Sequence, residues 1–211
     1  MSAPAPLVDA LRLVVILDLG VAGDRDLAAL AARAARGGAT MVQLRAKDTA
    51  ARDVADLARR VMAAAALPLV VNDRLDVALA VGAAGCHLGQ DDFPIDAARA
   101  IAPAGFWLGG SAGNPEEARR AAGAGAHYLG IGPVAVTASK ADAGAAIGVE
   151  GFRRVHAAAP TLFAVAIGAV TAALAPALLA AGAAGVAVIR AVLDAPDPES
   201  ATRVLRGAIG R

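Results

Sequence analysis

GAAGCHLG, at residues 82–89, is the stretch that decides the fold, because close versions of it recur along the chain. They read GGATMVQLR at 37–45, GAGAHYLG at 123–130 and GAAGVAVI at 182–189. Each version follows an alanine-rich segment, supplies a glycine that can adopt the left-handed conformation at a helix end, and then opens a short apolar strand. The repeat therefore predicts a helix followed by a strand, several times over.

Further strands are expected between these repeats, at residues 13–17, 69–71, 106–108 and 162–167, which makes eight in all. Helices are expected between the strands, for example at 24–36, 51–65, 115–122 and 171–181. Short apolar strands that alternate with helices pair in parallel through right-handed crossovers, and eight such units can close on themselves. We therefore expect one α/β domain over residues 1–211, a (β/α)8 TIM barrel, with residues 1–10 as a flexible leader.

Two other architectures compete with the barrel. An open doubly wound sheet is one, but no GxGxxG turn follows the first strand, which weakens its dinucleotide-binding form. The other is a membrane span, because residues 155–189 contain no Asp, Glu, Lys or Arg. Prolines and glycines interrupt that segment where strands and helices should end, so two buried strands and a helix explain it better. The helix in TAALAPALLAAG, at 171–182, has no charged face, and we expect a homodimer contact to cover it.

Composition excludes several classes of function. The chain has 20 basic and 19 acidic residues and a formal net charge of +1, so it has no overall field to hold nucleic acid or an acidic membrane surface. A single cysteine, Cys86, excludes an intramolecular disulfide and fits a reducing compartment. The first residues lack the pattern of a secretory signal peptide. We expect a cytoplasmic protein with no nucleic-acid or membrane partner.

Polar side chains follow the expected strands at their carboxyl ends, which is where barrel enzymes place their chemistry. Gln43, Arg45 and Lys47 alternate along one strand and would face the same side if the strand persists that far. A guanidinium and an ammonium group together suit a diphosphate. Salt bridges from these cations to Asp48 and Asp53 are the alternative.

Asp73 and Asp92 follow the next two strands and are candidate ligands for Mg²⁺, which takes one or two carboxylates plus substrate phosphate oxygens. Helix capping explains either aspartate equally well, since a helix is expected to begin just after each. The loop from Gly132 to Gly148 is longer than the other connections and is a candidate lid that would bring Lys140 to an anion. An ordinary mobile loop is the alternative.

Three segments together resemble the thiamine phosphate synthase family, namely VQLRAKD at 42–48, VNDRLDVALAVGAAGCHLGQDD at 71–92 and IGPVAVTASKAD at 131–142. The resemblance runs from about residue 13 to residue 189. It implies a transferase of thiamine biosynthesis that joins hydroxymethylpyrimidine diphosphate to thiazole phosphate and releases diphosphate with the help of Mg²⁺. In that family the pyrimidine carries a carbocation-like centre, which the thiazole nitrogen attacks.

The resemblance also implies roles for individual residues. Asp73 and Asp92 would bind Mg²⁺, and Arg45, Lys47, Ser111 and Lys140 would be catalytic. The pyrimidine diphosphate would be held by Gln43, Arg45, Lys47, Asn72, Ser111 and Lys140. The thiazole phosphate would be held by Thr137, Ser139, Gly168, Ala169, Ile189 and Arg190.

The sequence departs from the family pattern on the thiazole side. Residues 167–171 read IGAVT where the family has IGGIT, so Ala169 replaces a glycine. Arg190 replaces a serine after the last strand, and an arginine there could either bind the phosphate more strongly or fill the pocket. Gly113 and Asn114 stand where histidine and threonine are usual, and Val136 replaces a proline. Three functions stay open on this basis: a synthase with a modified phosphate pocket, a thiazole tautomerase-like isomerase, and a non-catalytic protein that binds thiamine precursors.

Overall fold

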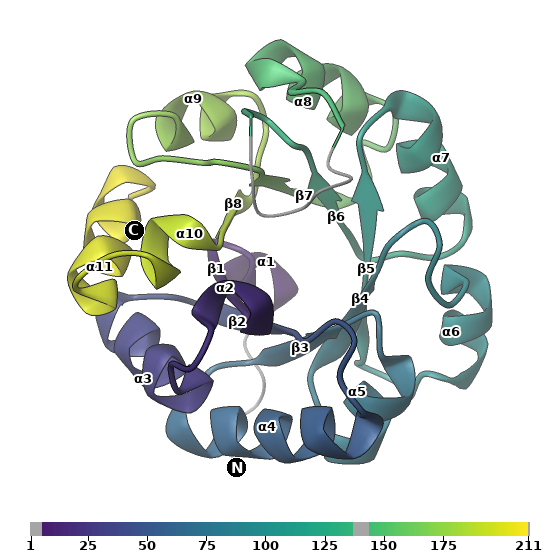
Figure 1. The fold of residues 1–211 in the computed structure, drawn as a ribbon. Coiled ribbons are helices and arrows are strands. Elements are labelled where there is room, and N and C mark those ends of the chain that lie inside the picture. The colour runs from purple at the N-terminus through teal and green to yellow at the C-terminus, as the bar shows by residue number, and fades with distance from the viewer. Residues whose placement is uncertain (1–5, 137–143, 211) are drawn as a thin grey trace.

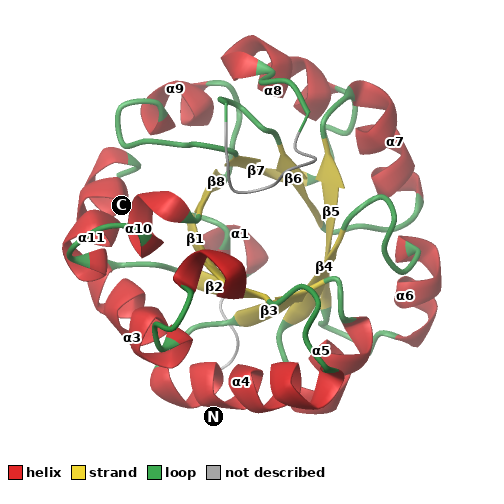
Figure 2. Cartoon of the chain, in the orientation of Figure 1, coloured by secondary structure: helices red, strands yellow, loops and turns green. Residues whose placement is uncertain are grey.

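The computed structural model describes residues 6–136 and 144–210 and shows a closed barrel of eight parallel strands in the order β1 to β8 (Figures 1 and 2). Helices form a ring around the barrel, and the long connections that carry α2 and α10 turn inward over one end of it. The single TIM barrel predicted from the repeat is confirmed.

The strands are β1 Leu13–Asp18, β2 Met41–Arg45, β3 Leu69–Asn72, β4 Gly85–Leu88, β5 Trp107–Ala112, β6 Tyr128–Ile131, β7 Phe163–Ile167 and β8 Gly185–Val188. The helices are α1 Leu7–Ala10, α2 Leu19–Ala22, α3 Leu27–Gly37, α4 Ala51–Ala64, α5 Leu75–Val81, α6 Ile95–Ile101, α7 Pro115–Gly123, α8 Gly148–Ala157, α9 Ala175–Ala180, α10 Arg190–Leu193 and α11 Pro198–Ala208.

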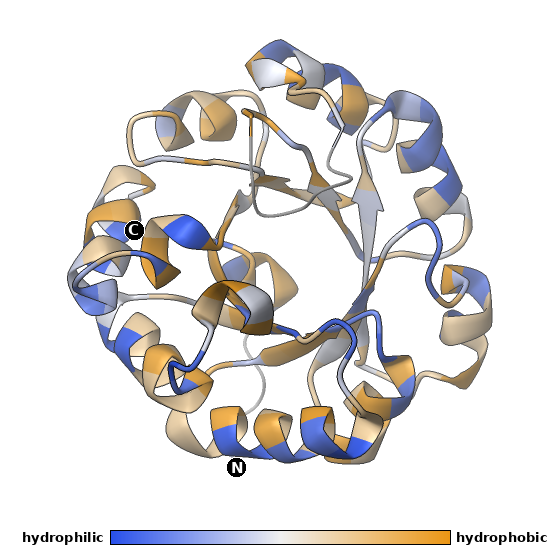
Figure 3. Cartoon of the chain, viewed as in Figure 1, coloured by the Kyte–Doolittle hydropathy of each residue, from blue (hydrophilic) through white to orange (hydrophobic). Residues whose placement is uncertain are grey.

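Alternation along the strands divides the core into two layers. In β1, Val14 and Ile16 pack inside the barrel, while Val15 and Leu17 pack outward against the helices. The outer layer is much the larger cluster and takes its helix contacts mainly from leucine, valine and alanine. Figure 3 shows the matching pattern on helices such as α4 and α7, where hydrophilic and hydrophobic residues alternate around the turns. Only the inward-facing residues of the strands can therefore reach a cavity at the end of the barrel.

The barrel closes where β8 pairs with β1, in the register Leu13 with Val186 and Val15 with Val188. Gly185 opens β8 at a point where a Cβ atom would overlap the carbonyl of Leu11 and lie 2.6 Å from the carbonyl carbon of Arg12. Glycine at this position thus allows the last strand to approach the first closely.

The leader differs from the expectation. Residues 7–10, expected to be flexible, form α1, and Ala10 is buried with Leu11 in the inner cluster of the barrel. The physical reason is that apolar side chains of the barrel interior would be exposed at the amino-terminal ends of the strands, and this short helix covers them. Residues 1–5 lie outside the described residues.

Helix α9 is shorter than expected and buries Ala175 and Leu178. The homodimer contact expected to cover α9 stays a prediction.

Throughout residues 6–136 and 144–210, every helix is too short or too polar to span a bilayer.

Gly185→Ala should destabilise the protein by about 3 kcal/mol or more, because the new methyl group would overlap backbone atoms that cannot move without breaking the β1–β8 pairing. Urea unfolding measures the change. Gly123→Ala is the matched control: apart from its own helix and chain neighbours, no described residue has an atom within 4 Å of a Cβ placed there. At the end of α7 alanine should be neutral or stabilise by about 0.5 kcal/mol. Equal effects of the two substitutions would contradict this account of closure.

Candidate active site

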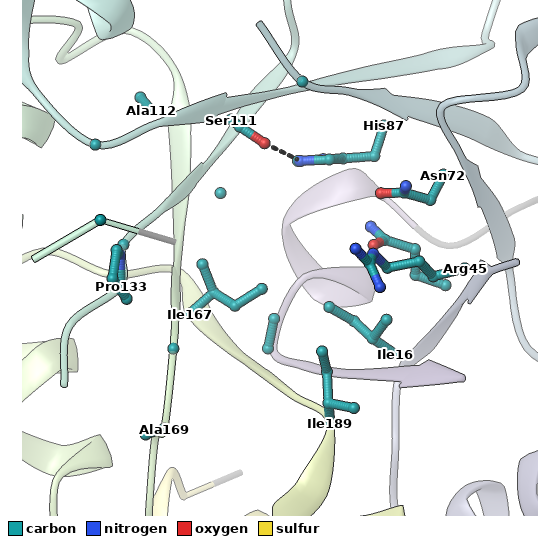
Figure 4. Close-up of a pocket in the computed structure, with 18 of the residues that line it drawn as sticks. Ile16, Arg45, Asn72, His87, Ser111, Ala112, Pro133, Ile167, Ala169 and Ile189 are labelled. Carbon is teal, nitrogen blue, oxygen red and sulfur yellow. Dashed lines mark hydrogen bonds between the residues drawn. The ribbon is translucent and has the colours of Figure 1, made fainter. Parts of the chain in front are cut away.

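A cavity of about 780 Å³ opens at the carboxyl ends of the strands. Every strand contributes to its lining, namely Ile16, Gln43, Asn72, His87, Ser111, Gly130, Ile167 and Val188 in strand order. Figure 4 shows Arg45, Asn72, His87 and Ser111 reaching into the cavity, with Ile167 and Ile189 among the apolar side chains around it. Of the polar residues expected to share one mouth, the structure brings Gln43, Arg45, Lys47, Asn72, Asp73, Asp92 and Ser111 together there.

Arg45 ends β2 inside this cavity, where its guanidinium pairs with the carboxylate of Asp18 at the end of β1. Both side chains are largely buried, with exposed fractions of 17% for Arg45 and 4% for Asp18. Asp18 also accepts a hydrogen bond from the Val21 backbone N–H at 3.0 Å and so caps α2. For Arg45 the alternative of a salt bridge to Asp48 or Asp53 is wrong among the residues that the structure describes.

Gln43 and Lys47 line the same cavity as Arg45, as the alternation along this segment predicts. Gln43 lies on β2 and is almost fully buried, and Lys47 lies two residues beyond the end of the strand. Asn72 ends β3 and is in register with His87 on β4. One wall of the mouth thus carries two cations and two amides.

Asp73 and Asp92 meet at the ends of β3 and β4, where their side chains are hydrogen-bonded to each other. Neither aspartate caps a helix: α5 begins after Arg74 and α6 after Pro94, both without a side-chain cap. Asp92 accepts the Gly89 N–H at 2.6 Å, and Asp73 adopts a left-handed backbone with φ of 63°. The capping alternative for these two residues is therefore wrong.

Burial and the neighbouring Asp92 carboxylate raise the pKa of Asp73 to about 7, although Lys47 and Arg45 act in the opposite direction. Because the Asp73 carboxyl resists becoming charged beside Asp92, a bound cation would be favoured at this place. The two carboxyl groups fit Mg²⁺, whose remaining ligands would be water and substrate phosphate oxygens. Among the residues that the structure describes, no cluster of three or more His, Cys, Asp or Glu forms a closed protein cage for a metal.

Ser111 lies near the end of β5 and is held by His87 of β4 and by Gln90, which follows that strand. Its hydroxyl is 3.1 Å from His87 Nε2, and its carbonyl accepts a hydrogen bond from the Gln90 side chain at 2.7 Å. Asn114, which replaces a threonine of the family pattern, still caps α7 through the N–H groups of Glu116 and Glu117. This replacement therefore keeps the helix start intact.

The opposite wall carries the departures from the family pattern. Gly168 and Ala169 both adopt positive φ, of 97° and 51°, directly after β7. A Cβ atom at Gly168 would lie 2.5 Å from Pro133, which explains the glycine there. Alanine at 169 is strained by its conformation, as expected if this position requires the left-handed region.

Arg190 begins α10 at the edge of the cavity, next to Ile189. Its guanidinium donates to Asp194 at 2.9 Å, and Arg25 lies 3.9 Å from the same carboxylate. The Arg190 side chain is about half exposed, so it can leave this partner at modest cost. Thr137, Ser139 and Lys140 lie outside the described residues.

Eight parallel strands that open on one mouth, with buried charges gathered at it, define a barrel enzyme. The family model described as thiamine monophosphate synthase matches residues 13–192. A thiamine-phosphate synthase of Roseiflexus is 46% identical over 92% of this chain and 84% of that protein, and one of Salinispora tropica is 52% identical over 80% and 83%. The chain belongs to the thiamine monophosphate synthase family and is a transferase of thiamine biosynthesis.

A solved structure agrees with this assignment, and a second one shares the fold. Thiamine phosphate pyrophosphorylase from Pyrococcus furiosus superimposes with a TM-score of 0.85 and 36% identity, covering 97% of this chain and 98% of that one. A 3-hexulose-6-phosphate synthase superimposes with a TM-score of 0.73 at 19% identity, covering 94% of this chain and 100% of that one, and so shares the fold alone.

The raised Asp73 pKa predicts how stability without metal depends on pH. The folded state keeps a proton that the unfolded state loses near pH 4, so the free energy of unfolding should fall as pH rises from about 4 to about 7. Asp92→Asn should reduce this fall, because it removes the neighbouring negative charge. Asp76→Asn is the control: Arg74 lowers the pKa of that exposed carboxyl, which therefore titrates below this range. Urea unfolding in chelator across this range is the measurement, and an unchanged slope in Asp92→Asn would contradict the pairing.

Ala169→Gly should stabilise the protein by about 1 kcal/mol, because glycine adopts the positive φ at this position without strain. Ala180→Gly, at the last residue of α9, is the control and should be neutral or destabilise by about 0.5 kcal/mol. Thermal unfolding distinguishes the two, and a destabilised Ala169→Gly protein would show that the backbone at 169 is not strained.

Proposed function

We propose that the protein joins hydroxymethylpyrimidine diphosphate to thiazole phosphate, giving thiamine phosphate and diphosphate, with Mg²⁺ as cofactor. The observation that carries this proposal is the wall of the cavity where Asp73 lies against Asp92, beside Arg45 and Lys47. Carboxylates for a divalent ion next to cations for phosphate oxygens form a pattern suited to a metal diphosphate.

The reaction is a substitution in which atoms and electrons balance without a redox partner. The bond between the pyrimidine methylene carbon and the diphosphate oxygen breaks, and a bond from the same carbon to the thiazole nitrogen forms. Arg45 and Lys47, with Lys140, would neutralise the charge that develops on the departing diphosphate. When bound between Asp73 and Asp92, Mg²⁺ would add Lewis-acid stabilisation of the same oxygens.

Positioning is the remaining task of this wall. Gln43, Asn72 and Ser111 would hold the pyrimidine diphosphate, and the Asp18 carboxylate would keep the Arg45 guanidinium in place. A carbocation-like centre reacts readily with water, so the apolar side chains Ile16, Ile167 and Ile189 have a function in keeping the cavity dry.

The thiazole phosphate would bind at the opposite wall, with Thr137 and Ser139 as further ligands. Backbone N–H groups in a turn can form a concavity that binds an anion, and Gly168 and Ala169 lie in the bend directly after β7. Ile189 and Arg190 approach the same part of the cavity from β8. Arg190 would exchange Asp194 for the substrate phosphate, which offers more oxygen acceptors and more charge.

The decisive assay follows thiamine phosphate when purified protein is mixed with both substrates and Mg²⁺. Product that depends on Mg²⁺ is the expected result. Tight binding of the pyrimidine diphosphate without product would favour a binding protein, and rearrangement of a thiazole phosphate without use of the diphosphate would favour the isomerase. Asp92→Asn should lower kcat/KM by about 100-fold or more, since it weakens stabilisation of the leaving group.

Arg190→Ser should raise the KM for thiazole phosphate about 10-fold, because one charge-assisted contact to phosphate is lost. Asp194→Asn should lower that KM, since it frees Arg190. The KM for the pyrimidine diphosphate is the internal reference and should stay constant in both. Arg120→Ser, on α7 outside the cavity lining, is the control. Tighter thiazole phosphate binding in Arg190→Ser would show that the arginine blocks the pocket instead of serving it.

A further inference from the structure

Two glycines make room for a pair of aromatic rings inside the barrel. Gly109 on β5 lies in register between His87 on β4 and Tyr128 on β6. A Cβ atom at Gly109 would lie 2.5 Å from both His87 Nδ1 and the Tyr128 hydroxyl oxygen, and one at Gly130 would lie 3.1 Å from His87 Cε1. The centroids of the His87 and Tyr128 rings are 5.5 Å apart, so the two rings occupy the space that side chains at 109 and 130 would otherwise take.

A chain of hydrogen bonds runs through these rings. Gln43 bonds to the Tyr128 hydroxyl, which lies 3.3 Å from His87 Nδ1, and His87 Nε2 lies 3.1 Å from the Ser111 hydroxyl. Tyr128 is buried behind the cavity and does not line it, whereas Gln43, His87 and Ser111 do. The chain thus links two cavity residues, Gln43 on β2 and Ser111 on β5, through a buried side chain that is not part of the cavity lining.

Such a chain has a direction, because a neutral imidazole has one N–H and one lone pair. In one sense Gln43 donates to Tyr128, Tyr128 to His87 Nδ1, and His87 Nε2–H to Ser111, so the Ser111 proton is free to point into the cavity. In the reverse sense Ser111 donates to His87 and offers only lone pairs. Burial raises the pKa of Tyr128, which keeps its hydroxyl neutral, and the Gln43 contact acts the other way, as a donor to the phenol oxygen does.

The surroundings favour the first sense as well. Arg45 and Lys47 prepare the cavity for an anion, and a hydroxyl that offered only lone pairs would repel the oxygens of that anion. A serine whose proton is already directed into the cavity would instead add a donor.

We propose that Tyr128 and His87 are positioning residues that hold the Ser111 hydroxyl as a hydrogen-bond donor toward the pyrimidine diphosphate. The identity of the ligand rests on the proposed function, whereas the direction of the chain does not. The role of Tyr128 in this account is to fix which nitrogen of His87 carries the proton.

The first test is a two-bond ¹H–¹⁵N spectrum of histidine-labelled wild-type protein near neutral pH. The chain has three histidines, so His127→Gln and His156→Gln suffice to assign the His87 signals. We expect His87 as the neutral Nε2–H tautomer. An Nδ1–H tautomer, or protonation of both nitrogens, would overturn the proposal. Tyr128→Phe should mix the two tautomers, and an unchanged spectrum in this variant would show that Tyr128 does not set the proton.

The second test is a double-mutant cycle on kcat/KM for the pyrimidine diphosphate. Tyr128→Phe should lower it about 3- to 10-fold in wild-type protein, the effect of one neutral hydrogen bond. In the Ser111→Ala background the same substitution should change it less than about 2-fold, because the group that it positions is gone. Additive effects would mean a merely structural role and would contradict the proposal.

His127→Gln is the matched control for the cycle. His127 directly precedes Tyr128, accepts the Leu108 N–H at 2.9 Å and does not line the cavity, so its substitution should leave kcat/KM unchanged. A protein with the expected His87 tautomer that made no thiamine phosphate would contradict the proposed function and leave the hydrogen-bond chain intact.

Discussion

The parallel pairing of β8 with β1 is the constraint on which the rest of the structure depends. Once the sheet closes, the carboxyl ends of all eight strands meet at one mouth, and inward-facing residues alternate with outward-facing ones on every strand. Residues as distant in sequence as Ile16 and Val188 then line one cavity. The small residues of the repeat, such as Gly185, allow this closure because they leave room for neighbouring backbone.

Charge inside the mouth is divided unequally. On the wall from β2 to β4, the buried Arg45–Asp18 pair joins two opposite charges that balance each other. Asp73 and Asp92 instead lie together where burial makes two negative charges unfavourable. The Arg45–Asp18 pair holds the guanidinium in place, and the Asp73–Asp92 pair would be stabilised by a bound cation. On the wall of β7 and β8 the backbone itself is strained at Ala169, and the arginine nearby is held by Asp194.

Much of this could be predicted from the sequence, because glycine ends and apolar strands are local signals. The strands expected at 13–17 and 69–71 are observed within one residue of those bounds. What the sequence did not reveal depends on closure. Asp18 is recognisable as the partner of Arg45 only once β1 lies beside β2. The chain of hydrogen bonds through Tyr128 and His87 requires the register of three strands. The glycines at 109 and 130 were the available signal, since glycine inside a strand often marks a close approach.

The central claim is that the wall of β2 to β5 holds a metal diphosphate. A crystal structure of the protein with the pyrimidine diphosphate and Mn²⁺ in place of Mg²⁺ tests it most directly, because anomalous scattering locates the metal. We expect a metal bound by Asp73 and Asp92, with diphosphate oxygens on Arg45 and Lys47 and the Ser111 hydroxyl donating to the ligand. A diphosphate bound at Gly168 and Arg190, or a metal away from both aspartates, would contradict it.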